Sequence, residues 1–176
     1  IAKAAKARGA EPTIYDEKPI HNANPDAIRE LQDLDISIRA SFDESWNSSN
    51  ADLVVTSPGV PKNHPKLLGA IANGLKVISE IEFAYRISKA PIVGITGTNG
   101  KSTTSVMTYL CLLHGGIEAV LCGNIFGSGY PEIPLTEAAD QSTADQILVA
   151  EISSFQLEWI EEFAYESSPE RVRRVL

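Results

Sequence analysis

Residues 91–103 read Pro91-Ile92-Val93-Gly94-Ile95-Thr96-Gly97-Thr98-Asn99-Gly100-Lys101-Ser102-Thr103. The continuous apolar character of residues 91–96 predicts a strand that is buried on both faces. A Gly-rich loop follows, and the pattern from Ser102 to His114 predicts a helix that Gly115 and Gly116 end. The apolar face of this helix is expected to contain Val106, Tyr109, Leu110 and Leu113. A strand, a Gly-rich loop and a helix in this order predict a phosphate-binding unit of an α/β protein.

The loop carries the groups that phosphate binding needs. Its backbone N–H groups can point inward at phosphate oxygens, and the helix start adds about half a positive charge. Lys101 can reach the terminal phosphates, and the Ser102 hydroxyl can ligate Mg²⁺. The spacing departs from the standard pattern, because Ile95 stands where the first glycine is usual. The alternative is a Gly-rich turn that precedes a helix without binding phosphate.

Strand-like and helix-like segments alternate along the rest of the chain. Strands are predicted at residues 12–16, 36–38, 51–56, 77–79, 117–121 and 146–150. Helices are predicted at residues 24–34, 64–73 and 80–88, and residues 126–145 are expected to form a loop with one weak helix. This alternation indicates a mostly parallel sheet, and therefore an α/β fold.

The chain begins within a pattern, because residues 1–8 read as the end of an Ala/Lys-rich helix that Gly9 stops. A helix without a cap at its start indicates that an upstream segment is missing. We therefore expect an incomplete Rossmann-like parallel sheet domain at residues 1–89, without its first strand and Gly-rich turn. The first half of a P-loop ATPase domain is expected at residues 90–176.

Polar residues follow several predicted strands. Glu151 comes directly after one of them, where a carboxylate is well placed to hold Mg²⁺ against a nucleotide. The alternative is that Glu151 is a solvated surface residue, as a lone Glu usually is. Asn124 follows another strand, and by itself it reads as a turn residue. The loop at residues 57–61 follows a third strand, at the carboxyl end where ligands bind in open α/β sheets.

Composition limits the classes of partner. The formal net charge of −8 argues against a broad nucleic-acid surface, although a single anionic ligand still fits a local positive site. Cys111 and Cys122 are expected to be buried small residues, and residues 158–162 to form a solvated helix face. No apolar run reaches the roughly 18–20 residues of a spanning helix, and no signal-peptide pattern is present. No membrane insertion and a cytoplasmic location are therefore expected.

Four segments together resemble one family, the Mur ligases. Residues 94–103 resemble the phosphate loop that these enzymes share with folylpolyglutamate synthase. The segment Glu151-Ile152-Ser153-Ser154-Phe155-Gln156-Leu157-Glu158 is more specific, and it resembles the D-glutamate-adding members. Cys122-Gly123-Asn124-Ile125 and Thr56-Ser57-Pro58-Gly59-Val60 fit the same members. The resemblance runs from about residue 1 to residue 163, and the tail beyond it drifts from the family pattern of a further apolar strand.

The resemblance implies a role for each matching position. The ATP phosphates would be held by Gly97, Thr98, Asn99, Gly100, Lys101, Ser102 and Thr103. Ser102 and Glu151 would bind the bridging Mg²⁺, and Lys101 and Glu151 would be the catalytic residues. The UDP part of the substrate would lie along Asp16, Glu17, Lys18, Ser57, Pro58 and Gly59. Its sugar and lactyl-alanine arm would face Asn124 and Ser153.

The implied reaction belongs to peptidoglycan synthesis, and so to cell wall biogenesis, cell shape and cell division. ATP would phosphorylate the alanine carboxylate of UDP-N-acetylmuramoyl-L-alanine, and the amine of D-glutamate would attack the acyl phosphate. Family members also carry a later modified Lys, a His and a third domain, so we expect this chain to be a monomeric, inactive fragment. Two alternatives stay open: another Mur ligase or folylpolyglutamate synthase-like enzyme, and a nucleotide-binding module without ligase activity.

Overall fold

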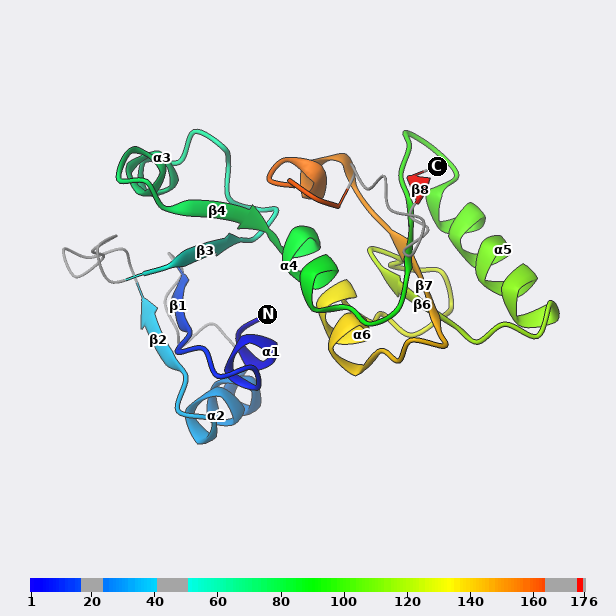
Figure 1. The fold of residues 1–176 in the computed structure, drawn as a ribbon, viewed down its shortest axis with the longest axis horizontal. Coiled ribbons are helices and arrows are strands. Elements are labelled where there is room, and N and C mark those ends of the chain that lie inside the picture. The colour runs from blue at the N-terminus through cyan, green and yellow to red at the C-terminus, as the bar shows by residue number, and fades with distance from the viewer. Residues whose placement is uncertain (17–23, 41–50, 164–173, 176) are drawn as a thin grey trace. The chain divides into compact units, whose positions relative to one another are not determined.

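The computed structural model describes residues 1–16, 24–40, 51–163 and 174–175 (Figure 1). The chain forms two compact units, one of residues 1–52 with 63–76 and the other of residues 53–62 with 77–176. The expected boundary between residues 89 and 90 separates a UDP-binding domain from an ATP-binding domain. It is not a boundary between these compact units, and it stays a prediction. Among the described residues, no helix has both the length and the apolar character that crossing a membrane requires.

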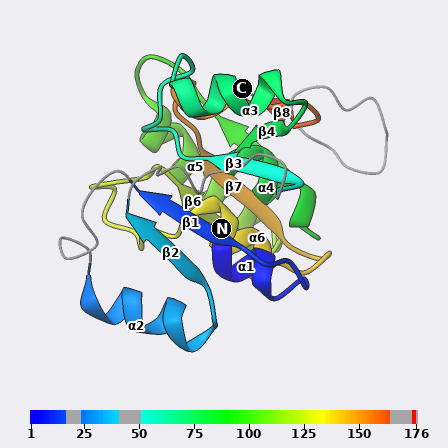
Figure 2. The same cartoon turned by 90° about the vertical axis from the view of Figure 1, so that its left-hand side faces the viewer.

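The first unit contains a βαβ arrangement. Its strands are β1 (Thr13–Asp16) and β2 (Ser37–Ala40), which pair in parallel from Thr13 opposite Ser37 to Asp16 opposite Ala40. Figure 2 shows the two strands side by side. Its helices are α1 (Ala2–Lys6), α2 (Pro25–Asp33) and α3 (Pro65–Ala72). A proline opens α2 and α3, and Asn24 and His64 accept a backbone N–H at their respective starts.

In the second unit, strand β3 (Leu53–Thr56) forms a two-stranded sheet with β4 (Lys76–Ser79). Helix α4 (Glu80–Ile87) follows β4 directly. Ser79 caps it, since the Ser79 hydroxyl accepts the Glu82 N–H at 3.2 Å.

A four-stranded sheet forms the centre of the second unit, with the order β6-β7-β5-β8 and parallel pairing between neighbouring strands. Its strands are β5 (Ile92–Ile95), β6 (Ala119–Gly123), β7 (Ile147–Glu151) and β8 (Arg174–Val175). Its helices are α5 (Lys101–His114) and α6 (Leu135–Gln141), and the short 3₁₀ helix η3 (Ser154–Leu157) follows β7. The predicted α/β fold with parallel strands is confirmed.

Successive residues of β7 enter two different cores, because side chains alternate across a strand. Leu148 and Ala150 pack with residues of α4 and α6, whereas Val149 packs with Val106, Tyr109 and other residues on the α5 side. Figure 1 accordingly shows α5 on one side of the sheet, and α4 with α6 on the other.

Three predictions about exposure and local structure were wrong in part. Leu110 and Leu113 are exposed, and Leu112 packs on the sheet instead. Cys122 is buried, but Cys111 is exposed on the outer side of α5. The acidic segment at residues 158–162 contains no helix, and the N–H groups of Glu161 and Glu162 bond to the Glu82 side chain of α4.

Candidate functional site

The loops that follow β5, β6 and β7 leave the sheet at one edge. Ile95 lies opposite Glu151 in the β5–β7 pair, and Gly123 lies opposite the same residue in the β6–β7 pair. Because the three strands are parallel, their carboxyl ends meet at this edge, where ligands bind in open α/β sheets. The phosphate loop, Asn124 and Ser153 all begin within two residues of these strand ends.

The phosphate loop occupies residues 96–100 and is largely exposed. Gly100 has a φ of +76° and precedes α5, so the sharp entry into the helix uses the left-handed region that favours glycine. No side chain caps α5. The first-turn N–H groups of this 14-residue helix therefore have no side-chain acceptor and can accept an anion.

The Lys101 ammonium folds back over the loop and donates to the Gly97 carbonyl at 2.9 Å. It stands at the first position of α5, with Ser102 next to it, and both residues are half-buried. The Lys101 ammonium lies against the loop and next to the helix N-terminus. Together they make a local positive site in a chain whose net charge is negative.

Glu151 is the last residue of β7, and only 3% of it is exposed. Its Oε2 atom is buried and has no hydrogen-bond partner among the described residues. A buried carboxylate oxygen without a donor is costly unless a cation satisfies it. Glu151 and the hydroxyl of Ser102 are oxygen ligands of the type that Mg²⁺ prefers, so the residues present fit that ion.

Asn124 and Ser153 lie at the starts of the two neighbouring loops. The Asn124 N–H donates to the Glu151 carbonyl at 2.9 Å, and the residue is exposed. The Ser153 N–H donates to the Gln156 side chain at 2.8 Å, and this bond caps the start of η3. These bonds fix the backbone of both residues, and the role of their side chains in ligand binding stays a prediction.

The predicted UDP-binding residues are described in part. Asp16 ends β1 in the first unit, whereas Glu17 and Lys18 lie outside the described residues. Ser57, Pro58 and Gly59 follow β3 in the second unit and are exposed, and the Val60 N–H closes a turn on the Ser57 carbonyl at 3.0 Å. Their role in binding stays a prediction.

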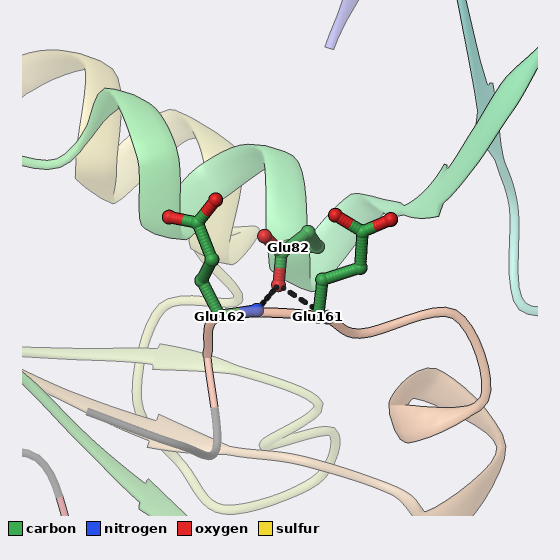
Figure 3. Close-up of side chains that lie close together, drawn as sticks. All are labelled: Glu82, Glu161 and Glu162. Atoms are coloured by element: carbon green, nitrogen blue, oxygen red, sulfur yellow. Dashed lines mark hydrogen bonds between the residues drawn. The ribbon is translucent and has the colours of Figure 1, made fainter. Parts of the chain in front are cut away.

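Glu82, Glu161 and Glu162 form an acidic cluster that was not predicted from the sequence, which had the last two only as part of a solvated helix face. Figure 3 shows Glu82 of α4 facing the backbone of Glu161 and Glu162. The Glu82 side chain is fully buried and accepts the N–H groups of Glu161, Glu162 and Phe163 at 3.0, 3.1 and 3.1 Å. Its other oxygen accepts the Arg86 Nε–H at 2.8 Å. Arg86 and the backbone donors thus satisfy this carboxylate, so a metal ion is not needed there.

These contacts set the charge state of Glu82. Burial alone would raise the pKa of its carboxyl, but the backbone N–H donors and Arg86 outweigh burial and lower that pKa below its ordinary value. The one sequence signal was the spacing Ser79-x-x-Glu82, which is typical of a helix start. It locates the cap, but it does not predict that the carboxylate reaches residues 161–163.

The parallel sheet, the Gly-rich loop before α5 and the buried carboxylate at the end of β7 define the chain as an α/β protein of the P-loop class. No protein-family model matches the chain. Curated relatives do match, among them three with the name UDP-N-acetylmuramoylalanine–D-glutamate ligase. The chain is 41% identical to that of Enterococcus hirae over 170 residues, which cover 92% of the chain and 34% of the relative.

The relative from Bacillus cytotoxicus is 36% identical over 162 residues, covering 92% of the chain and 34% of the relative. The one from Listeria monocytogenes serotype 4b is 40% identical over 156 residues, covering 88% and 33%. Over about nine-tenths of its length, the chain is therefore similar to Mur ligases that add D-glutamate. It spans about a third of the length of the curated relatives that it matches.

Among solved structures, the chain is similar to a UDP-N-acetylmuramate:L-alanyl-gamma-D-glutamyl-meso-diaminopimelate ligase from Neisseria meningitides. The TM-score is 0.48 and the identity 24%, and the match covers 92% of this chain and 52% of the other.

Proposed function

We propose that the protein to which this chain belongs is an ATP-dependent ligase that joins D-glutamate to UDP-N-acetylmuramoyl-L-alanine in peptidoglycan synthesis. The observation that carries the proposal is the 36–41% identity to ligases of that name over 88–92% of the chain. The geometry supports it through Glu151, which pairs with the last residue of β5 and whose buried Oε2 atom has no hydrogen-bond partner among the described residues.

Each group at the sheet edge has a part in this proposal. Residues 97–103 hold the ATP phosphates through backbone N–H groups, the Lys101 ammonium and the N-terminus of α5. Ser102 and Glu151 hold Mg²⁺, which supplies charge neutralisation on the transferred phosphoryl group. Lys101 stabilises the same charge, and one such preorganised donor contributes roughly 3–4 kcal/mol to transition-state stabilisation.

Other residues bind UDP-N-acetylmuramoyl-L-alanine in this proposal. Asp16, Glu17 and Lys18, with Ser57, Pro58 and Gly59, bind the UDP part in this proposal. Asn124 and Ser153 face the sugar and the alanine carboxylate that ATP phosphorylates. The D-glutamate amine then attacks the acyl phosphate, so that an amide forms and phosphate leaves. We place the reaction in the cytoplasm and propose a monomeric protein.

A second candidate is a nucleotide-binding module without ligase activity. It is favoured by one observation: Lys101 and Glu151 lie at one sheet edge of a chain that aligns with only about a third of the length of its relatives. This candidate predicts that the chain binds MgATP and forms no amide. Another Mur ligase or a folylpolyglutamate synthase-like enzyme would instead prefer a different acceptor.

Calorimetric titration of the chain separates these candidates. UDP-N-acetylmuramoyl-L-alanine, its D-glutamyl product form and MgATP are each titrated into the chain, and circular dichroism verifies the fold. Tighter binding of the alanyl form than of the product form supports the D-glutamate-adding assignment. If a folded chain binds MgATP but neither UDP compound, the substrate assignment is wrong and the module remains.

A further inference from the structure

Side chains of helix α4 bond to the far ends of both segments that carry the proposed substrate-binding residues: to Thr136 of α6, just after the β6 loop, and to residues 161–163 of the β7 loop. The β6 loop runs from Asn124 to Pro134 and leads into α6, and the β7 loop runs from Ile152 to Phe163. Each loop is fixed at its start by the sheet, since the Asn124 N–H bonds to the Glu151 carbonyl and the Ile152 N–H to the Ile95 carbonyl. The far end of each loop is held by a side chain of α4.

The far end of the β7 loop is held by Glu82. Its buried carboxylate accepts three consecutive backbone N–H groups, those of residues 161–163, and Arg86 bonds to both Glu82 and Glu161 at 2.8 and 2.9 Å. The Ser79 N–H adds a bond to the Trp159 carbonyl at 2.8 Å. A carboxylate that accepts several N–H groups makes strong, charge-assisted bonds, so this end of the loop is firmly placed.

The far end of the β6 loop is held by Glu80. One of its carboxylate oxygens accepts both the N–H and the hydroxyl of Thr136, which is itself 3% exposed at the start of α6. The Gly123 N–H donates to the Ile133 carbonyl at 2.9 Å, which closes the loop just before this contact. Both acids stand in the first turn of α4, where the helix dipole favours negative charge.

We infer that Glu80 and Glu82 are positioning residues for the proposed substrate site: Glu80 fixes the loop that carries Asn124, and Glu82 fixes the loop that carries Ser153. This inference rests on the proposed function. The phosphate loop joins β5 to α5, and the described hydrogen bonds of the two carboxylates run to Thr136, Arg86 and residues 161–163 rather than to this loop. Loss of either acid therefore weakens substrate binding and leaves nucleotide binding in place.

The test compares two loop-specific variants in the 176-residue chain. Glu82→Gln removes the charge that faces residues 161–163, while Thr136→Val removes the hydroxyl bound to Glu80 and keeps the side-chain shape. Glu158→Gln and Glu137→Gln are the matched controls, because these acids are exposed in the same loop and on the same helix. Amide hydrogen exchange measures local opening, which reports loop stability separately from global unfolding.

Glu82→Gln is expected to speed exchange about tenfold in residues 152–163 and to leave residues 124–134 unchanged, and Thr136→Val is expected to do the reverse. Each variant is expected to bind UDP-N-acetylmuramoyl-L-alanine about tenfold more weakly and MgATP within about twofold of the parent chain. Both controls are expected to match the parent chain.

Equal loss of both ligands, or faster exchange throughout the sheet, would show that the two acids only stabilise the fold, and would overturn the inference. Unchanged exchange in both loops would overturn it as well. If the folded parent chain binds MgATP but not the UDP compound, the proposed function fails together with the substrate part of the inference. Exchange then still shows whether each acid fixes its own loop.

Discussion

Gly123 and Glu151 stand opposite each other at the ends of β6 and β7, and a Cβ atom on Gly123 would lie 2.3 Å from the Glu151 carbonyl oxygen. Gly123 also has a φ of +87°, which residues with side chains rarely adopt. The backbone of the proposed Mg²⁺ ligand therefore depends on a residue without a side chain on the neighbouring strand.

Replacing Gly123 by Ala is expected to lower the free energy of unfolding by about 3 kcal/mol or more, because a backbone clash adds to the strained φ. Urea unfolding followed by circular dichroism measures the change. Gly127→Ala is the matched control, since Gly127 has a φ of +69° but open space around its Cβ position, and its cost should be about 1 kcal/mol. Equal effects of the two substitutions would contradict the close approach.

Replacing Lys101 by Ala is expected to weaken MgATP binding about a hundredfold, because a charge-assisted bond to the terminal phosphates is lost. Calorimetry measures the affinity. The folded state should lose less than about 1 kcal/mol, since the Lys101 ammonium is partly exposed and bonds only to one loop carbonyl among the described residues. Lys89→Ala, a change at an exposed lysine before β5, is the control. Unchanged affinity in Lys101→Ala would remove Lys101 from the phosphate site.

Replacing Glu151 by Gln is expected to act in opposite directions on stability and on function. Without Mg²⁺ the free energy of unfolding should rise by about 1 kcal/mol, because the substitution removes the charge of a buried carboxylate whose Oε2 atom has no hydrogen-bond partner among the described residues. With nucleotide present, the variant should need more Mg²⁺ than the parent chain. Thermal unfolding across a Mg²⁺ titration measures both effects. An unchanged Mg²⁺ dependence would exclude Glu151 from the metal site.

The Glu82 contacts make stability depend on pH. Since the pKa of Glu82 is lower in the folded chain than its ordinary value of 4.5, its contribution is present above 4.5 and is lost as pH falls through the folded pKa. The difference in free energy of unfolding between the parent chain and Glu82→Gln should thus be constant from neutral pH to about pH 5 and shrink below that. Urea unfolding at several pH values measures it, and a difference that grows in acid would contradict the contact.

Local chemistry explains which elements were predictable. Asn24, His64 and Ser79 accept a backbone N–H at a helix start, and Gly9 and Gly74 have positive φ values just after a helix. These signals act within a few residues, so the element order follows from them. The boundaries differ at β6, which begins at Ala119 rather than at the predicted residue 117.

The candidate site was predictable in so far as it depends on strand ends. Lys101 and Ser102 were predicted at the start of a helix after a Gly-rich loop, and Glu151 at the end of a strand, and the structure has them there. Parallel pairing then brings these strand ends to one edge. Whether the residues bind ATP, Mg²⁺ and the UDP substrate stays a prediction.

The sequence by itself determined the α/β alternation, the Gly-rich loop before a helix and the resemblance to the Mur ligases, because periodicity, capping and motif residues act over short distances along the chain. Only the tertiary structure decided which apolar residues of α5 face the sheet, and that Leu110 and Leu113 do not. It alone placed Glu82 against Glu161, 79 residues away in the chain. Such contacts depend on which elements pack together, and hydrogen bonds to buried groups form only after that packing has excluded water.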